Sequence, residues 1–468
     1  MLLKHKKIKL FTVLLFLLSG MSLSSCKKYV DAGTPVNLLT PDKVFTDSLA
    51  TLGAVLALYS NPNINGLASN STVSQASLIF DLNLFGSMSA DDAYLYNNAS
   101  FDQYRTNTLS ADNFTLSIYS LPYTAVNIAN KAIEGISGSS FSTAYKNQLI
   151  GECEFWRAYA YFNLVNCFGD VPLVTTTNVT ANATLPRAPV ASVYKQMIAD
   201  LSDAKNRVSV AYPSAEKARV NQATVFALLS RVYLYQQKWD SAEYYATQII
   251  GSGTYSLEPN LNNVFIKTSK ETIWQVISNV AAGINGVTKM GVSFLPGTTV
   301  PIFVLYDTLA RTFETGDGRK TNWTQSMAYN GSTFYYPYKY KIRINTVSGN
   351  EYNVMFRLAE QYLIRSEARA MQNNISGAQD DLNIVRNRAG LANTTASTQA
   401  DLLTALEHER WVELFTEMSD RWFNLKRTGR IDAVLSLIKP QWKPFQALYP
   451  IPTSEITANP NLTKNPGY

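Results

Sequence analysis

The 468-residue chain carries 41 lysine and arginine residues against 35 aspartate and glutamate residues, a net charge of +6. Four of those lysines and no acidic residue lie in residues 1–25, so residues 26–468 have 37 basic and 35 acidic residues, a net charge of +2. This balance removes the support for a nucleic-acid partner, which needs a clustered basic face. With only two histidines, the chain cannot build a histidine-rich zinc site.

The N-terminus predicts a lipoprotein signal peptide over residues 1–25. Four lysines among residues 4–9 precede the apolar run LFTVLLFLL at residues 10–18, which is shorter than the roughly 20 residues of a membrane-spanning helix and fits a secretory signal. LSSC at residues 23–26 resembles a bacterial lipobox, so we expect lipidation of Cys26. The alternative is an ordinary cleavage site followed by a buried cysteine. No later stretch approaches 18 consecutive apolar residues, so we expect a lipid anchor without a membrane span.

Apolar residues recur at spacings of three and four through much of the remaining chain, which predicts a mostly α fold. The predicted helices span residues 49–59, 116–136, 144–168, 190–208, 221–236, 241–250, 357–373, 378–389 and 401–428. Two loop-rich stretches lie between them, at about 60–112 and 251–355; the second holds 10 of the 23 glycines. Because no linker separates these textures, we expect residues 26–468 to form a single unit with inserted loop-rich lobes containing short β-hairpins.

Two segments, residues 225–250 and 362–390, resemble helix pairs of tetratricopeptide (TPR) repeats. In the first pair, Asp240 is a plausible N-cap, with Glu243 completing a capping box. These pairs predict a solenoid-like helical scaffold. Cys153 and Cys167 lie fourteen residues apart on one predicted helix, a separation of about 21 Å. A disulfide requires about 7 Å or less, so we expect two free, buried thiols.

The loop-rich stretches carry aromatic rings flanked by amides and carboxylates. Rings cover the C–H faces of sugars, and amides or carboxylates bond their hydroxyls, so these stretches predict a sugar-binding surface. The alternative for each ring is packing between the lobe and the scaffold. The candidate ligand-binding residues are Asp91, Asp92, Tyr94, Tyr96, Asn97, Asn98, Trp323, Gln325, Tyr329 and Tyr335.

The stretch YNGSTFYYPYKYK at residues 329–341 predicts a β-hairpin, because Asn330-Gly331 is a strong turn signal. Pro337 argues for an edge strand. Alternation along the second strand places two sets of side chains on opposite faces. We expect the first set to be core: Phe334, Tyr336, Tyr338 and Tyr340 on one face, against Tyr335, Pro337, Lys339 and Lys341 on the other.

Acidic residues near the C-terminus have a structural interpretation. Glu409, Glu413 and Glu417 share one face of the predicted helix over residues 401–428, and Glu417 and Arg421 are spaced for a helical ion pair. The single histidine outside the signal peptide, His408, lies among charged residues and is predicted to be solvated. No nucleophile motif, phosphate loop or calcium loop is present, so we expect no catalysis, cofactor or metal.

Four blocks carry a resemblance to a known family: EFWRAYAYFNLVNCFGDVPLV (154–174), the TPR-like pair at 225–250, FRLAEQYLIRSEARA with LNIVRNRAG (356–370 and 382–390), and ERWVELFTEMSDRWFNLKRTG with LYPIPTSEITANPNLTKNPGY (409–429 and 448–468). Together they resemble the SusD/RagB family of outer-membrane nutrient-binding lipoproteins. The likeness covers nearly the whole chain after residue 25. Asn424 and Lys464 stand where this family usually has aspartate and glutamine.

The resemblance implies a lipid-anchored outer-membrane protein facing the cell exterior. Such a protein captures a glycan, or in some members a peptide, and delivers it to a SusC-like TonB-dependent transporter without catalysis. Two alternatives stay open. A surface glycosidase would need two carboxylates about 5–10 Å apart in a cleft, for which Asp91-Asp92 is the tempting pair. A TPR-type scaffold would bind another protein or a peptide.

Overall fold

Helices make up most of the backbone in the computed structural model, which describes residues 41–60, 77–110, 115–281, 284–344 and 348–468. The predicted signal peptide and Cys26 lie outside these residues. The described residues from 48 onward belong to one unit, and residues 41–47, with α2 (Pro41–Val44), belong to another. The α-helices of the larger unit are α3 (Ser48–Ser60), α4 (Leu78–Ser89), α5 (Asp102–Thr106), α6 (Leu116–Ser137), α7 (Thr143–Phe168), α8 (Val179–Asn182), α9 (Val190–Arg207), α10 (Gln222–Tyr235), α11 (Trp239–Gly251), α12 (Lys289–Phe294), α13 (Asp307–Thr312), α14 (Gly318–Trp323), α15 (Leu358–Met371), α16 (Ile375–Arg388), α17 (Gln399–Leu414), α18 (Asp420–Arg427), α19 (Ile431–Ile438) and α20 (Thr453–Ala458). The prediction of a mostly α fold is confirmed.

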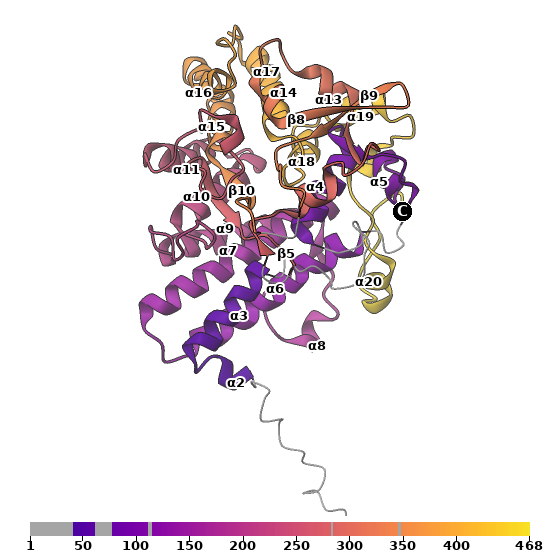
Figure 1. Cartoon of the computed structure of the whole chain (residues 1–468). Helices are drawn as coiled ribbons and strands as arrows, with labels where there is room; N and C mark the ends of the chain where they lie inside the picture. The colour runs from indigo at the N-terminus through magenta and orange to yellow at the C-terminus, as the bar shows by residue number, and fades with distance from the viewer. Residues whose placement is uncertain (1–40, 61–76, 111–114, 282–283, 345–347) are drawn as a thin grey trace, which may run out of the picture. The chain divides into compact units, whose positions relative to one another are not determined.

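Helix α7 lies between α6 and α9, which both pack along it, and these three helices form one helical layer (Figure 1). Arg157 of α7 joins the three helices, because its guanidinium donates to Asp200 of α9 at 2.6 and 2.8 Å and to Asn130 of α6 at 2.8 Å. The helix ends at Gly169, whose φ of +73° belongs to the left-handed region that glycine adopts without strain. Cys153 and Cys167 are buried, free thiols, as predicted.

The two TPR-like pairs are α10–α11 and α15–α16, and α11 packs on α15. Small side chains allow this close approach: Ala242 and Ala246 of α11 and Ala368 of α15 are fully buried together. The capping box predicted at Asp240 is wrong, because α11 begins at Trp239 and has no side-chain cap. Glu243 instead forms an ion pair with Arg369 of α15, at 2.8 Å.

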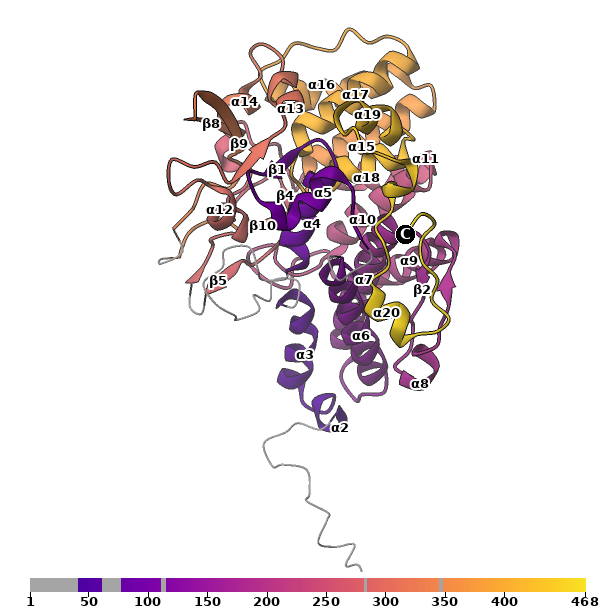
Figure 2. The ribbon, with the colours of Figure 1, turned by 90° about the vertical axis from the view of Figure 1, so that its right-hand side faces the viewer.

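The strands form two-stranded antiparallel sheets. Their pairs are β1 (Ala93–Leu95) with β7 (Phe303–Leu305), β2 (Val171–Pro172) with β3 (Arg187–Ala188), β4 (Thr272–Val276) with β10 (Asn353–Arg357), β5 (Asn279–Ala281) with β6 (Ile284–Asn285), and β8 (Thr324–Tyr329) with β9 (Ser332–Pro337). Three short 3₁₀ helices complete the described elements, at Ala99–Phe101, Leu261–Asn263 and Pro444–Ala447. The predicted hairpin is confirmed: Asn330 and Gly331 both have positive φ, 49° and 75°, as a type I′ turn requires. Figures 1 and 2 both place this hairpin beside α13 and α14.

Helices α4 and α17 differ from the sequence prediction. Helix α4 lies in a stretch predicted to be loop-rich; all of its residues are buried, so it has no polar face and no helical periodicity to detect. The helix predicted over 401–428 is broken after Leu414, and Thr416, Met418 and Ser419 have positive φ. Side chains of α4 and of Asp92 compensate the break by bonding backbone N–H groups of this segment.

The C-terminal tail folds back onto the helical layer. Asn465 donates from its side chain to the backbone oxygens of Phe168 and Tyr449, at 3.0 and 2.8 Å. Tyr468 donates its hydroxyl to the backbone oxygen of Leu448 at 2.8 Å. The tail therefore ties the end of α7 to the segment after α19.

Candidate functional site

Strand β1 presents two tyrosines on the loop-rich lobe. Tyr94 pairs with Val304 of β7, and the Tyr96 N–H donates to the Ile302 oxygen at 2.8 Å, which extends the ladder by one residue. Because side chains two apart on a strand share a face, Tyr94 and Tyr96 project on the same side. The Tyr94 ring packs on Tyr306, just after β7, with ring centroids 5.0 Å apart. All three tyrosines are half-buried.

The β8–β9 hairpin brings two further rings to Tyr96. The centroid of the Tyr96 ring lies 5.9 Å from that of Tyr329 and 4.9 Å from that of Phe334, and both pairs are nearly edge-on. The register pairs Met327 with Phe334 and Tyr329 with Ser332, so Tyr329 and Phe334 lie on one face of the hairpin. We call the set Tyr94, Tyr96, Tyr306, Tyr329 and Phe334 the aromatic face. Each ring is half-buried and keeps surface for a ligand.

Polar groups border the aromatic face. Asn97 is exposed and left-handed, with φ of 52°. The half-buried Asn98 has its side-chain oxygen engaged by the Ser100 N–H at 3.1 Å. Arg105 lies over the Tyr94 ring at 5.9 Å and pairs with Asp102 at 2.9 Å. Rings bordered by amide and guanidinium groups can cover the C–H face of a sugar and bond its hydroxyls.

Asp91 and Asp92 are buried, each with 2% of its surface exposed. Asp91 accepts two hydrogen bonds from Arg421, at 2.7 and 2.9 Å. Asp92 accepts from the Trp411 indole at 2.8 Å and from the Thr416 N–H at 2.9 Å. Burial, followed by repulsion from Asp91, raises the pKa of Asp92 to about 7. These carboxylates anchor the start of β1 to α17 and α18 and have no free surface for a ligand.

Trp323 is also buried, with no exposed surface, and its indole donates to the Leu261 oxygen at 2.9 Å. Gln325 is exposed on the hairpin face that carries Tyr329. Tyr335 pairs with Ser326 and therefore lies on the opposite face. The structure thus brings together Tyr94, Tyr96, Asn97, Asn98, Gln325 and Tyr329 on one side of the lobe. It places Asp91, Asp92 and Trp323 in the interior.

The expectation that the tyrosine ladder is core is wrong for Phe334, Tyr336 and Tyr338, whereas Tyr340 packs on Phe265 with ring centroids 5.4 Å apart. Pro337 and Lys339, on the face predicted to be outward, are buried, whereas Phe334, Tyr336 and Tyr338 are half-buried. Lys339 can be buried because its ammonium group donates to the backbone oxygens of Glu413 and Phe415, at 2.9 and 2.8 Å. Sequence reasoning also missed Tyr306 and Phe334. Tyr306 directly follows a fully buried strand, which is the signal that could have identified it.

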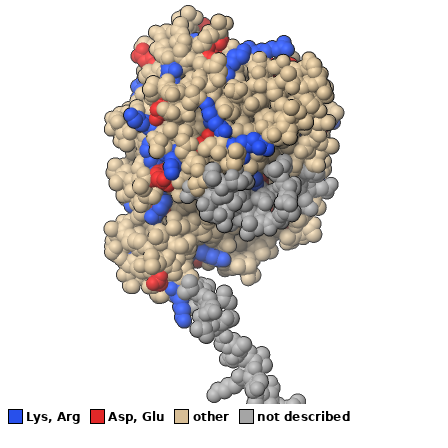
Figure 3. Space-filling model, in the orientation of Figure 1, with Lys and Arg blue, Asp and Glu red and all other residues tan. Residues whose placement is uncertain are grey.

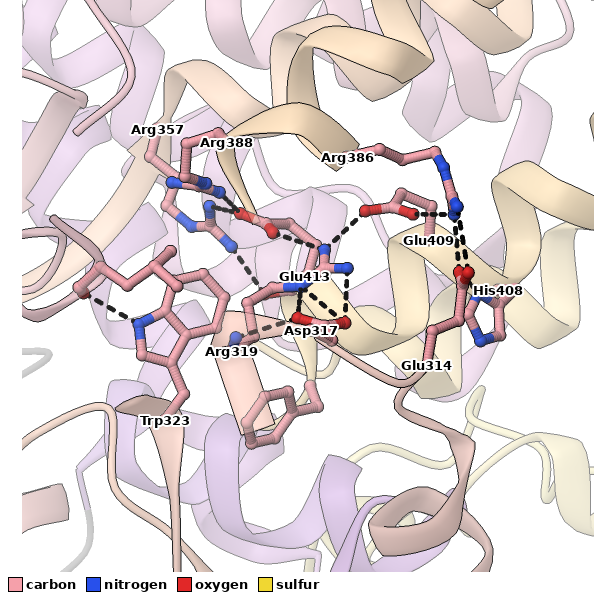
Figure 4. Close-up of polar contacts among 12 residues, drawn as sticks. Glu314, Asp317, Arg319, Trp323, Arg357, Arg386, Arg388, His408, Glu409 and Glu413 are labelled. Atoms are coloured by element: carbon pink, nitrogen blue, oxygen red, sulfur yellow. Dashed lines mark hydrogen bonds and ion pairs between the residues drawn. The ribbon is translucent and has the colours of Figure 1, made fainter. Parts of the chain in front are cut away.

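A buried ion network fixes the lobe to α17 (Figure 4). Arg319 of α14 bonds Asp317, Glu409 and Glu413 at 2.8, 2.6 and 2.9 Å, and its side chain has no exposed surface. Arg357 and Arg388 add their guanidinium groups to Glu413. These cations hold the pKa of Glu413 well below its usual range despite its burial. Glu409 and Glu413 do share a helical face, and their role is structural.

The predicted Glu417–Arg421 ion pair is wrong, because Glu417 lies beyond the end of α17. It accepts from Arg357 at 2.9 Å and from Lys339 at 2.6 Å, while Arg421 is engaged by Asp91. The network therefore reaches from α17 through the break in the helix to the residues that follow the hairpin.

His408 is half-buried, and its Nε2–H donates to the backbone oxygen of Thr312, 3.1 Å away. His408, Glu314 and Glu409 could each offer a ligand atom within 4.8 Å of the others. Arg386 already lies against these carboxylates, at 2.7 Å from Glu314 and 3.2 Å from Glu409. A guanidinium at this position supplies the positive charge that a metal ion would bring, so the electrostatics favour an ion pair.

The surface carries charges of both signs, and the apolar character of the helices can be compared with that of membrane spans. On the face drawn in Figure 3, lysines and arginines are scattered and interspersed with acidic side chains. Among the described residues, no helix combines the length and apolar character needed to cross a bilayer.

Known proteins resemble this chain along most of its length. Residues 61–234 match the family model described as "Starch-binding associating with outer membrane", and residues 306–468 match the model of the SusD family. SusD-like protein P25 of Formosa agariphila is 22% identical, with 98% of each chain covered. A solved laminarin binding SusD-like protein has a TM-score of 0.76 at 22% identity, covering 90% of this chain and 100% of its own. Surface glycan-binding protein A from Bacteroides fluxus has a TM-score of 0.75 at 21% identity, with the same coverage.

Proposed function

This chain belongs to the SusD/RagB family, and from that premise we propose that it binds an oligo- or polysaccharide at the aromatic face. The observation that carries the proposal is the convergence of Tyr96, Tyr329 and Phe334, from segments far apart in the sequence, into one half-buried cluster. A cluster needed only for packing would be sealed by other elements. This one is bordered by Asn97 and Gln325, which are exposed.

The proposed setting is the outer surface of the outer membrane. The lipobox at residues 23–26 supports a lipid on Cys26, and the family description of association with the outer membrane supports the location. The bound glycan would pass to a SusC-like TonB-dependent transporter, the partner that the family resemblance implies. Co-purification of an outer-membrane barrel protein with the detergent-solubilised chain tests this partner; recovery of only periplasmic proteins would contradict it.

A glycosidase is the weaker alternative. Asp91-Asp92 has one feature of a catalytic pair, since the pKa of Asp92 is raised to about 7. Both carboxylates are nevertheless buried and bonded to Arg421, Trp411 and a backbone N–H. A sugar cannot reach them without unfolding this part of the lobe, so we propose binding without hydrolysis.

A TPR-type scaffold is the other alternative. The TPR-like pairs pack on each other and on α17, so part of the apolar surface that a peptide would need is used within the fold. A chain that binds only proteins or peptides would not be retarded by any polysaccharide in the following experiment.

The experiment compares ring removal on and off the aromatic face. Affinity electrophoresis in gels containing laminarin, starch or pectin is run with the parent chain, Tyr96→Ala and Tyr329→Ala. Tyr244→Ala is the matched control, because Tyr244 is 56% exposed on α11. We expect at least one polysaccharide to retard the parent and the control. Each face variant should bind about tenfold more weakly, equal to about 1.4 kcal/mol. Equal retardation of all four proteins, or no retardation of the parent by any of the three polysaccharides, would overturn the proposal.

A further inference from the structure

A cavity of about 620 Å³ lies among α10, α11, α15, α17 and α18, separate from the aromatic face. Its volume falls within the range of small-molecule sites, about 300–1,000 Å³. Gln237, Thr404 and Arg430 line it and are exposed, so the cavity has an open mouth. Leu406 and Arg410 line it and are buried, so it also has a floor inside the fold.

Two indole rings line the cavity, Trp239 at the start of α11 and Trp411 on α17, and both are half-buried. Trp411 is held firmly: its indole donates to Asp92 at 2.8 Å, and the Arg421 guanidinium lies 4.0 Å from the ring centroid. A fixed ring beside an open mouth is a surface on which a ring-shaped ligand can pack.

Each of the four arginines that line the cavity already faces a carboxylate. Arg410 pairs with Asp420, Arg421 with Asp91, Arg427 with Glu367, and Arg430 with Glu407. Charge at the cavity wall is therefore compensated within the protein. An anionic ligand would compete with these carboxylates, whereas an uncharged ligand would leave the pairs intact.

Hydrogen-bonding groups at the mouth of the cavity are accessible to a ligand. Gln237, Thr404 and Thr428 line the cavity and are exposed. The Gln237 amide offers donors and an acceptor, and the two threonine hydroxyls, which donate to backbone oxygens at 3.0 and 2.8 Å, can still accept. The wall thus combines packing rings and balanced charge with accessible polar groups at its mouth.

We propose that this cavity is a second ligand site, which takes one or two uncharged sugar residues. A sugar has a C–H face for an indole and many hydroxyls for the amide and hydroxyl groups at the mouth. The choice of a sugar over another uncharged, oxygen-rich ring molecule rests on the proposed function. The site itself rests on the cavity and its wall.

Isothermal titration calorimetry on the full-length chain in detergent tests the site. The probes are the disaccharides laminaribiose, maltose and cellobiose, with glucuronate as a charged probe. Thr404→Trp places an indole at the mouth without removing an ion pair, and Thr428→Trp is a second blocking variant. Thr457→Trp is the matched control: like Thr404, Thr457 is exposed and its hydroxyl donates to the backbone oxygen four residues earlier.

We expect at least one disaccharide to bind the parent and Thr457→Trp, and to bind both blocking variants at least tenfold more weakly. Tyr96→Ala should bind that disaccharide like the parent even where it loses laminarin, so failure of the aromatic face and failure of the cavity give different results. The inference is overturned if no disaccharide binds, if blocking and control variants bind alike, if glucuronate binds more tightly than every disaccharide, or if Tyr96→Ala weakens disaccharide binding as much as Thr404→Trp does.

Discussion

Replacing Arg319 with methionine tests whether the buried ion network holds the loop-rich lobe to α17. Its guanidinium bonds Asp317, Glu409 and Glu413, and none of the four side chains has exposed surface. Methionine removes the charge. Glu409 keeps Arg386, and Glu413 keeps Arg357 and Arg388. Asp317 is left without an ion-pair partner among the described residues. Removing one member of a buried pair costs about 3–5 kcal/mol, mostly from the carboxylate that stays behind.

Urea unfolding followed by circular dichroism measures the loss. Arg311→Met is the control, since Arg311 pairs with Asp307 at the surface, with side chains 82% and 81% exposed. Exposed pairs contribute about 0–1 kcal/mol, so the control should leave the midpoint almost unchanged. Because Asp317 also caps α14, which leads into β8, Arg319→Met should weaken binding at the aromatic face as well. A loss of stability below about 1 kcal/mol would refute the assignment of the network as the attachment of the lobe.

Two further predictions concern pH and the hairpin turn. Burial, and repulsion from Asp203, raise the pKa of Glu154 to about 9, so between about pH 4.5 and 9 the folded state keeps a proton that the unfolded state releases. The free energy of unfolding should therefore fall as pH rises, by up to about 1.4 kcal/mol per pH unit. In urea titrations, the stability of Glu154→Gln relative to the parent should increase between pH 5.5 and 8. A stability difference that stays constant over this range would contradict the prediction. Gly331 has φ of 75°, and a Cβ added to it would meet no atom within 4 Å. Gly331→Ala should therefore lose only about 1 kcal/mol of stability, from backbone strain, which a lower melting temperature would show. A loss above about 3 kcal/mol would mean that other residues pack against the turn.

Helical periodicity identified the long helices to within a few residues, because each has an apolar stripe and polar neighbours. It failed where that contrast is absent. Helix α4 is buried on all sides, and a helix of this kind leaves no stripe. The break after Leu414 was missed for another reason: its left-handed residues Thr416, Met418 and Ser419 are held by Asp92, Asn83 and the Leu82 oxygen. These contacts come from more than 300 residues away, and local sequence carries no record of them.

Residue type predicted which segments lie at the candidate site better than it predicted which of their residues face a ligand. Tyr94 and Tyr96 do belong to the aromatic face, and Asn97 and Asn98 directly follow them, because one side of β1 is only half-buried. Trp323 has the same chemistry but is surrounded by cations: Lys339 lies 4.9 Å and Arg388 5.4 Å from its ring. It packs over the buried ion network. Whether an aromatic ring meets a ligand or a buried charge depends on long-range packing, which composition does not encode.

Asp91 and Asp92 show how a supporting residue can resemble a binding residue. A pair of carboxylates next to half-buried tyrosines has the composition of a sugar site, yet both point inward to Arg421 and Trp411. These partners come from the elements that line the cavity, so the same two carboxylates fix the start of β1 and the position of the cavity wall. Loss of either carboxylate would leave a buried donor or cation unpaired. Their side chains therefore act on the aromatic face through the backbone of β1, and substituting them would disturb both proposed sites without removing a ligand contact.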